Sequence, residues 1–139
     1  DSTSPFIEVI EKFSNGRLRV WYDGLVVTCS VHKQPSLAYS KLQKLLSEIP
    51  DSVIIAYAGL NNGAGPMLSA NSSVPVITVP ATYKEFPEDV WSSLRTPSNV
   101  PVMTVLEPKN ATLAALKILA MRNPSLYAIL RGEQEKLMT

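Results

Sequence analysis

The residues best suited to chemistry lie in one short segment, Ser30-Val31-His32-Lys33. His32 is the only histidine of the chain, and it follows an apolar run that is typical of a β-strand. An imidazole can accept and donate a proton near neutral pH, because its unperturbed pKa lies close to that range. Ser30 and Lys33 could hold an anionic ligand beside it. The segment therefore predicts proton transfer next to a bound anion, with a purely structural histidine as the alternative.

Two serines near the start of the chain could contribute to the same site. Ser2 and Ser4 precede Pro5, which is typical of the first turn of a helix. Unpaired N–H groups and the positive end of a helix dipole, together with two hydroxyls, suit a phosphate. Simple capping of the helix is the alternative role for Ser4.

A glycine-rich loop, residues 58–66, is the third candidate segment. It begins at Ala58, and its glycines permit a flat ligand to lie directly on the main chain: Gly59, Gly63 and Gly65. Asn62 could hydrogen-bond to a heterocycle or cap the next helix. The spacing matches neither a P-loop nor a dinucleotide-binding fingerprint, and a tight structural turn is the alternative.

Alternating strand and helix patterns predict an α/β fold in which helices cover both faces of a parallel sheet. The expected strands lie within 18–29 and at 52–57, 74–79 and 100–106. The expected helices begin at Pro5 and Pro35, run over 111–122 behind the N-cap Asn110, and extend from Ser125 to the C-terminus. Two apolar stripes are expected to be buried: Leu37, Ala38, Leu42, Leu45, Leu46 and Ile49 in the second helix, and Leu113, Leu116, Leu119 and Ala120 in the third.

Such a sheet binds ligands at the carboxyl ends of its strands, where the three candidate segments and the segment from Pro80 onward should meet. Since a first strand would normally precede the first helix, we expect the sequence to be a piece of a longer polypeptide. Three aromatic residues in the 80–99 connection could either contact another subunit or seal the core: Tyr83, Phe86 and Trp91.

Composition excludes several classes of protein. The 139 residues suit one domain, and 13 Lys plus Arg against 12 Asp plus Glu provide no basic surface for nucleic acid or an anionic membrane. The single Cys29 cannot form an internal disulfide, which favours a reducing compartment such as the cytoplasm. No apolar run approaches the length of a membrane span, and no Cys/His cluster predicts a metal site.

Together these segments resemble the 5-aminoimidazole ribonucleotide (AIR) carboxylase family. The resemblance covers almost the whole chain. It comprises Ser2-Thr3-Ser4, Ser30-Val31-His32-Lys33, Ala58-Gly59 with Asn62-Gly63-Ala64-Gly65-Pro66, and Asp89-Val90-Trp91-Ser92-Ser93-Leu94-Arg95 with Pro97-Ser98. It implies a three-layer, flavodoxin-like domain over residues 1–139, a cytoplasmic octamer and, for the animal type, fusion to a succinocarboxamide synthetase domain.

The resemblance also implies a reaction and a set of roles. The substrates would be AIR and carbon dioxide, with no cofactor or metal. The order His32-Lys33, with a lysine directly after the histidine, resembles the branch of the family that carboxylates AIR directly. His32 would accept the proton from the ring carbon, and return it in the reverse reaction. The phosphate and ribose would contact Ser2, Ser4, Ser30 and Lys33, and the base would lie on the loop containing Ala58, Gly59, Asn62, Gly63 and Gly65.

The chain departs from the family pattern at several positions of the expected site: Asp1, Pro5, Val31, Leu60, Asn61 and Asn99, the last replacing a glycine. These departures support an alternative hypothesis, in which a catalytically weak or silent domain serves as the oligomeric core of a fused synthetase. A third hypothesis, that the domain is a phosphate-sensing or flavin-binding module, rests on fold analogy alone.

Overall fold

The structure is a computed structural model that describes residues 4–14, 27–60 and 63–139. Its described strands form one parallel sheet in the order β1 (Ile54–Ala58), β2 (Val76–Pro80) and β3 (Met103–Thr104). The first pair is in register from Ile54 opposite Val76 to Ala58 opposite Pro80. Every residue of β2 is buried, as expected for a central strand covered on both faces.

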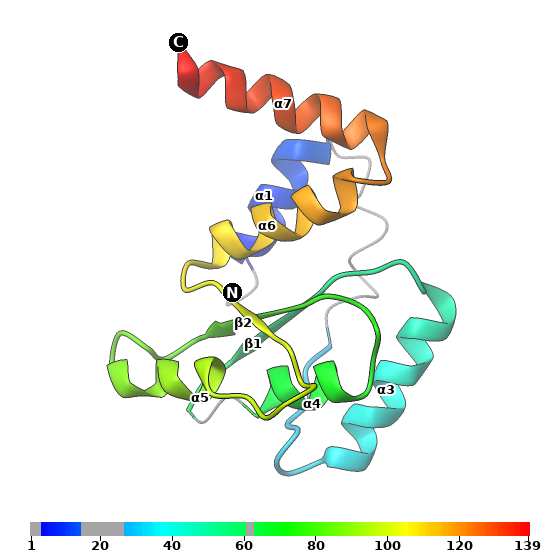
Figure 1. Ribbon diagram of the computed structural model, residues 1–139, viewed down its shortest axis with the longest axis vertical. Coiled ribbons are helices and arrows are strands. Elements are labelled where there is room, and N and C mark those ends of the chain that lie inside the picture. Colours follow the sequence, from blue (N-terminus) through cyan, green and yellow to red (C-terminus); the bar gives the residue numbers. More distant parts are fainter. Residues whose placement is uncertain (1–3, 15–26, 61–62) are drawn as a thin grey trace.

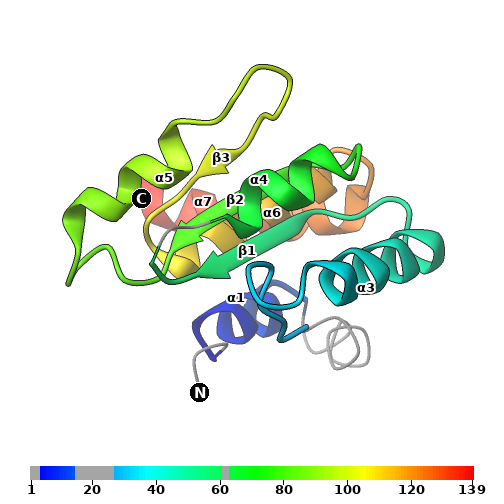
Figure 2. The same ribbon diagram turned by 90° about the horizontal axis from the view of Figure 1, so that it is seen from below.

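Helices cover the sheet on both sides (Figure 1). One layer contains α1 (Ser4–Ser14), α6 (Pro108–Ala120) and α7 (Pro124–Met138). The opposite layer contains α3 (Pro35–Glu48), α4 (Ala64–Ala70) and α5 (Val90–Leu94), the last preceded by a short 3-10 turn at Pro87–Asp89. Figure 2 shows the strands between these two layers, with α4 lying along the sheet. The predicted three-layer α/β/α arrangement is therefore confirmed.

Proline fixes the start of three helices. α3, α6 and α7 each begin with proline, whose preset φ suits the first turn and whose missing N–H costs nothing there. At α7 the side chain of Asn123 also accepts a hydrogen bond of 3.1 Å from the backbone N–H of Leu126, which satisfies one unpaired donor.

The apolar core lies on the α1/α6/α7 side of the sheet. One cluster joins the three helices through Leu116, Ala120, Leu126 and Leu130, with Val9 packed against it. A second cluster joins α6 to the sheet through Ile77, Val79, Ala111 and Ala115, with Phe6 and Ile55 packed against it. These clusters position α1 and α6 so that both helices begin at the edge of the sheet where the strands end (Figure 2).

On the opposite face, α4 approaches the sheet through glycine. Gly65 is buried, and a β-carbon there would overlap the Cγ2 methyl of Thr78 in β2. The hydroxyl of Thr78 lies 3.1 Å from the hydroxyl of Thr104, so this threonine is also held by a hydrogen bond. Gly65 therefore allows close helix–sheet packing rather than contact with a ligand.

Several boundaries differ from the sequence-based expectation. α6 begins at Pro108 behind Glu107, so Asn110 lies inside its first turn and is not its N-cap, because Pro108 already suits the first position. α1 and α7 each begin one residue earlier than expected, at Ser4 and Pro124. β3 has only two residues, and α5 interrupts the region expected to be a long connection.

Two of the expected buried positions are exposed. Leu37 of α3 and Leu119 of α6 face solvent, whereas Ala38, Leu42, Leu116 and Ala120 are buried as predicted. In both helices only a narrower stripe of alanine and leucine side chains is buried against the rest of the chain. The predicted stripes were therefore too wide. Of the strand expected within 18–29, residues 18–26 lie outside the described residues, and residues 27–29 are not in a strand.

Asn99, one of the departures from the resembled pattern, has an unusual backbone conformation. It has φ 68°, in the left-handed region, and among the described residues it is the only non-glycine with a positive φ. Asparagine tolerates this region better than other residues with a side chain. Asn99 therefore occupies a backbone conformation that favours glycine.

Among the helices of the described segments, none combines the length and the apolar character needed to cross a membrane.

Candidate functional site

The His32 segment forms a tight turn immediately before α3. The backbone N–H of Gln34 donates to the carbonyl of Ser30 at 2.8 Å, and the N–H of Lys33 donates to Oγ of Ser30 at 3.2 Å. Ser30 therefore shapes the turn through both its backbone and its side chain. His32 and Lys33 are exposed, so both side chains are accessible to a ligand in solution.

The turn brings His32 onto the glycine-rich loop. A β-carbon built on Gly63 would lie 2.7 Å from Nε2 of His32 and 3.1 Å from Cε1. The imidazole therefore lies directly over Gly63, the residue before the first turn of α4. Two segments separated by about thirty positions in the chain, and both predicted to belong to one site, are thus in contact.

The start of the loop contacts the segment that follows β2. The carbonyl of Ala58 accepts a hydrogen bond of 2.8 Å from the N–H of Ala81. A β-carbon on Gly59 would be at an ordinary distance of 3.5 Å from Cγ2 of Thr82. Oγ1 of Thr82 is buried and has no hydrogen-bond partner among the described residues. Sequence reasoning expected the segment from Pro80 onward at this edge but did not single out Thr82.

The first turn of α1 also lies at this edge of the sheet. The Phe6 ring packs edge-on against Tyr57 in β1, with ring centroids 5.3 Å apart and an angle of 69° between the planes. Ser4, half-buried at the start of α1, is thereby placed near the carboxyl end of β1. Ser2 and Asn62, and the departures Asp1 and Asn61, lie outside the described residues. Leu60 projects into solvent.

A cavity of about 210 Å³ lies at the carboxyl ends of the strands. Tyr57, Pro80 and Leu106 line it at the strand ends, and Lys84, Glu85 and Glu107 supply its charged groups. The segment from Pro80 onward was expected at this edge, but none of these residues was predicted individually as a site residue, and His32 does not line the cavity. A larger hollow of about 440 Å³ lies at the opposite edge, near Ser72 and Pro101. Parallel sheets bind ligands at the carboxyl edge, so the smaller cavity is the more relevant one.

Two of the three aromatic residues in the 80–99 segment are exposed. Trp91 is 52% exposed and Phe86 42% exposed, and the guanidinium of Arg95 lies 5.1 Å from the centroid of the Trp91 ring. These two side chains do not seal the core of their own chain. Tyr83 is half-buried and lines the carboxyl-edge cavity.

Among the residues that the structure describes, no group of three or more His, Cys, Asp or Glu side chains could hold a metal ion.

A parallel, three-layer α/β domain with a histidine turn over a glycine-rich loop defines a flavodoxin-like protein with a candidate proton-transfer site. The particular family follows from comparison with known proteins. The family model described as AIR carboxylase matches residues 5–139, and the chain belongs to that family.

Relatives with curated names agree with this membership. The chain is 43% identical over 94 residues to the "Probable multifunctional protein ADE2" of Caenorhabditis elegans, an alignment covering 68% of the chain and 22% of that protein. It is 35% identical over 104 residues to the human "Bifunctional phosphoribosylaminoimidazole carboxylase/phosphoribosylaminoimidazole succinocarboxamide synthetase". That alignment covers 74% of the chain and 24% of the human protein. The chain is 36% identical over 102 residues to the "Phosphoribosylaminoimidazole carboxylase" of Archaeoglobus fulgidus, an alignment covering 73% of the chain and 56% of that protein.

The aligned region therefore spans about a quarter or less of the length of these bifunctional relatives. Among solved structures, the crystal structure of Treponema denticola PurE matches with a TM-score of 0.75 and 24% identity, covering 97% of this chain and 86% of that one. At this identity the match shows the fold alone.

Proposed function

We propose that the chain is an AIR carboxylase domain that adds carbon dioxide directly to the ring carbon of AIR, giving the 4-carboxy product in purine biosynthesis. One observation carries the proposal: in a member of this family, an exposed His32 lies over Gly63 of the glycine-rich loop. A proton acceptor and a main-chain surface for a flat base are thus adjacent.

The reaction follows from the chemistry of the substrate. The electron-rich aminoimidazole ring attacks carbon dioxide through its ring carbon, forming a C–C bond and leaving that carbon tetrahedral. Loss of its proton to His32 restores the aromatic ring, and the same imidazole returns the proton in the reverse decarboxylation. The chain's own groups bind and orient the substrate and move this proton.

Binding roles are assigned by position. Ser4 at the start of α1 and Lys33 beside His32 are proposed to hold the phosphate and ribose, together with Ser2. The loop from Ala58 and Gly59 to Asn62 and Gly63 is proposed to bind the base. Ser30 is proposed as a further ligand contact, and its Oγ also accepts a hydrogen bond from the backbone N–H of Lys33. Gly65 is not proposed to bind the base, because it packs against Thr78.

The wider assignments are proposals as well. Residues 1–139 would form one carboxylase domain of a longer bifunctional polypeptide, which the printed names of the animal relatives support. It would act in the cytoplasm as a homo-oligomer, with the octamer as the expected state, and the exposed Trp91 and Phe86 would suit subunit contacts. The relatives named as carboxylases support an active enzyme over a silent oligomeric core.

The test is incorporation of labelled bicarbonate into AIR by the purified chain in the absence of ATP. The parent should form acid-stable labelled product, and His32→Asn should be slower by about 10²–10⁴-fold, the usual contribution of general acid–base catalysis. Lys117→Gln, on the exposed side of α6, is the matched control and should keep the parent rate. Equal background rates for the parent and His32→Asn would support the silent-core alternative.

A further inference from the structure

Gly63 has a backbone conformation that does not require glycine. Its φ is −78° and its ψ is −13°. This is the ordinary right-handed helical region, which residues with a side chain also adopt readily. The usual reason for a glycine, a positive φ, is therefore absent at this position. The residue must be explained by what surrounds it.

The three atoms nearest to a β-carbon built on Gly63 all belong to the His32 ring. A β-carbon there would lie 2.7 Å from Nε2, 3.1 Å from Cε1 and 3.7 Å from Cδ2 of His32. The first two distances are shorter than normal contact between non-bonded atoms, so any side chain at position 63 would displace the imidazole. Two other described glycines have open surroundings: a β-carbon on Gly59 meets Thr82 at 3.5 Å, and one on Gly132 meets nothing within 4 Å.

We propose that Gly63 is a positioning residue for His32, and that it directs the Nε2–Cε1 edge of the imidazole onto the start of α4. The ring is held from two sides. The Ser30 turn fixes the backbone that carries it, and Gly63 provides the surface on which its edge lies. Nε2 is then the nitrogen that faces the glycine-rich loop and exchanges the proton. This inference rests on the proposed function only for the role of that proton.

The arrangement can be tested without measuring activity. Because the chain has one histidine, its imidazole gives a single set of NMR signals. In the parent chain we expect a nuclear Overhauser effect between the Hε1 proton of His32 and the α-protons of Gly63. The same effect should persist in Gly132→Ala, whose new methyl group contacts nothing. A parent chain that folds and lacks this effect would overturn the proposal, and that measurement needs no variant.

The variant Gly63→Ala then tests the consequence for catalysis. It should remove contact between the Nε2–Cε1 edge and position 63, and reduce kcat on the order of 10²-fold, as expected when a reacting group is misplaced by about 1 Å. The kcat of Gly63→Ala should fall by a larger factor than its KM rises, because Gly63 also belongs to the loop proposed to bind the base, and both constants of Gly132→Ala should stay near the parent values. A folded Gly63→Ala with parent kcat and an unchanged ring environment would contradict the assignment. If the parent itself has no carboxylase activity, the proposed function fails, but the NMR measurement still decides whether Gly63 positions the ring.

Discussion

The two helical layers contact the sheet in different ways. The α1/α6/α7 layer packs through leucine, isoleucine, valine and alanine side chains that form both described apolar clusters. The opposite layer places α4 on β2 through Gly65 and Thr78, and it carries the His32 turn at the start of α3. One layer therefore contains most of the apolar burial, and the other contains the proposed proton-transfer residue.

This difference indicates that stability and catalysis depend on different residues. Removing an apolar side chain from α6 should weaken the fold without altering the environment of His32, because α6 and α3, which follows the Ser30 turn, lie on opposite sides of the sheet (Figure 1). A change where α4 meets the sheet should affect both properties, because Gly63 and Gly65 are only two residues apart. Three substitutions, ordered by expected effect, test this comparison.

Leu116→Ala should have the largest effect on stability. Leu116 is 4% exposed and belongs to the cluster that joins α1, α6 and α7. Leucine-to-alanine changes in a core lower the free energy of unfolding by about 2–5 kcal/mol, through lost burial and the cavity that remains. Denaturant unfolding would measure this loss. The folded fraction should retain the parent kcat, and a large fall in kcat per folded molecule would show that the two layers are not independent.

Gly65→Ala should have an intermediate effect on stability and should also reduce activity. The new methyl overlaps Cγ2 of Thr78, and overpacking of this kind costs about 1–3 kcal/mol. Thr78→Ser removes that methyl and keeps the hydroxyl that lies near Thr104. The double variant should therefore unfold at a higher denaturant concentration than Gly65→Ala alone. No recovery in the double variant would mean that the clash with Thr78 is not the cause.

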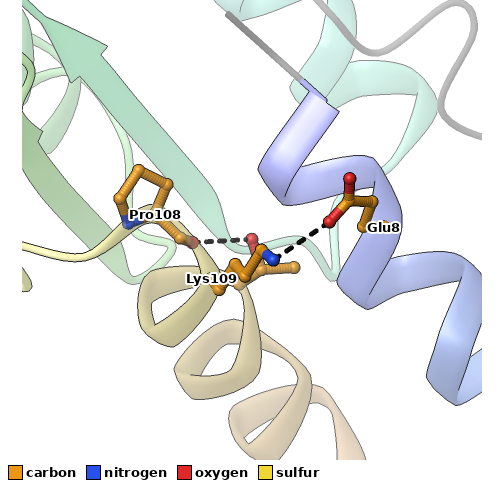
Figure 3. A network of polar contacts seen from close by, with 4 residues as sticks. Glu8, Pro108 and Lys109 are labelled. Atoms are coloured by element: carbon orange, nitrogen blue, oxygen red, sulfur yellow. Dashed lines mark hydrogen bonds and ion pairs between the residues drawn. The ribbon is translucent and has the colours of Figure 1, made fainter.

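Glu8→Gln should have the smallest effect. Glu8 of α1 and Lys109 of α6 form an ion pair of 3.1 Å at the surface, beside the hydrogen bond from Thr112 to the carbonyl of Pro108 (Figure 3). Both side chains are more than half exposed, and such pairs contribute about 0–1 kcal/mol. Thermal unfolding in low and high salt should differ slightly for the parent and less for the variant. A loss comparable to that of Leu116→Ala would show that charge, rather than apolar burial, holds this layer.

Local signals in the sequence predicted much of the fold. Pro35 begins a helix as predicted, and the apolar runs around residues 55 and 77 are strands of the parallel sheet. The prediction placed Asn110 as an N-cap because its side chain suits that role, but Pro108 already began the helix two residues earlier. α5 was missed because it has only five residues and lies between prolines 87 and 97.

The candidate site was less accessible to sequence reasoning. The presence of His32, Lys33 and the glycines was evident, but glycine spacing alone does not tell which glycine meets a ligand, a side chain or the sheet. Gly63 contacts His32, Gly65 contacts Thr78, and Gly59 lies near Thr82. These contacts join residues distant in the chain, and they depend on how closely α4 packs on β2. The same holds for the charged groups of the carboxyl-edge cavity, which come from two separate segments, Lys84 with Glu85 and Glu107.

Cys29 gives the Ser30 turn an experimental use. It is the only cysteine of the chain, it is partly exposed, and its Sγ lies 3.9 Å from the carbonyl of Gln34 across the turn. A maleimide dye attached to this thiol would place a fluorophore three residues from His32 without any engineered cysteine. Changes in its emission during titration with a sugar phosphate would report ligand binding optically, in real time.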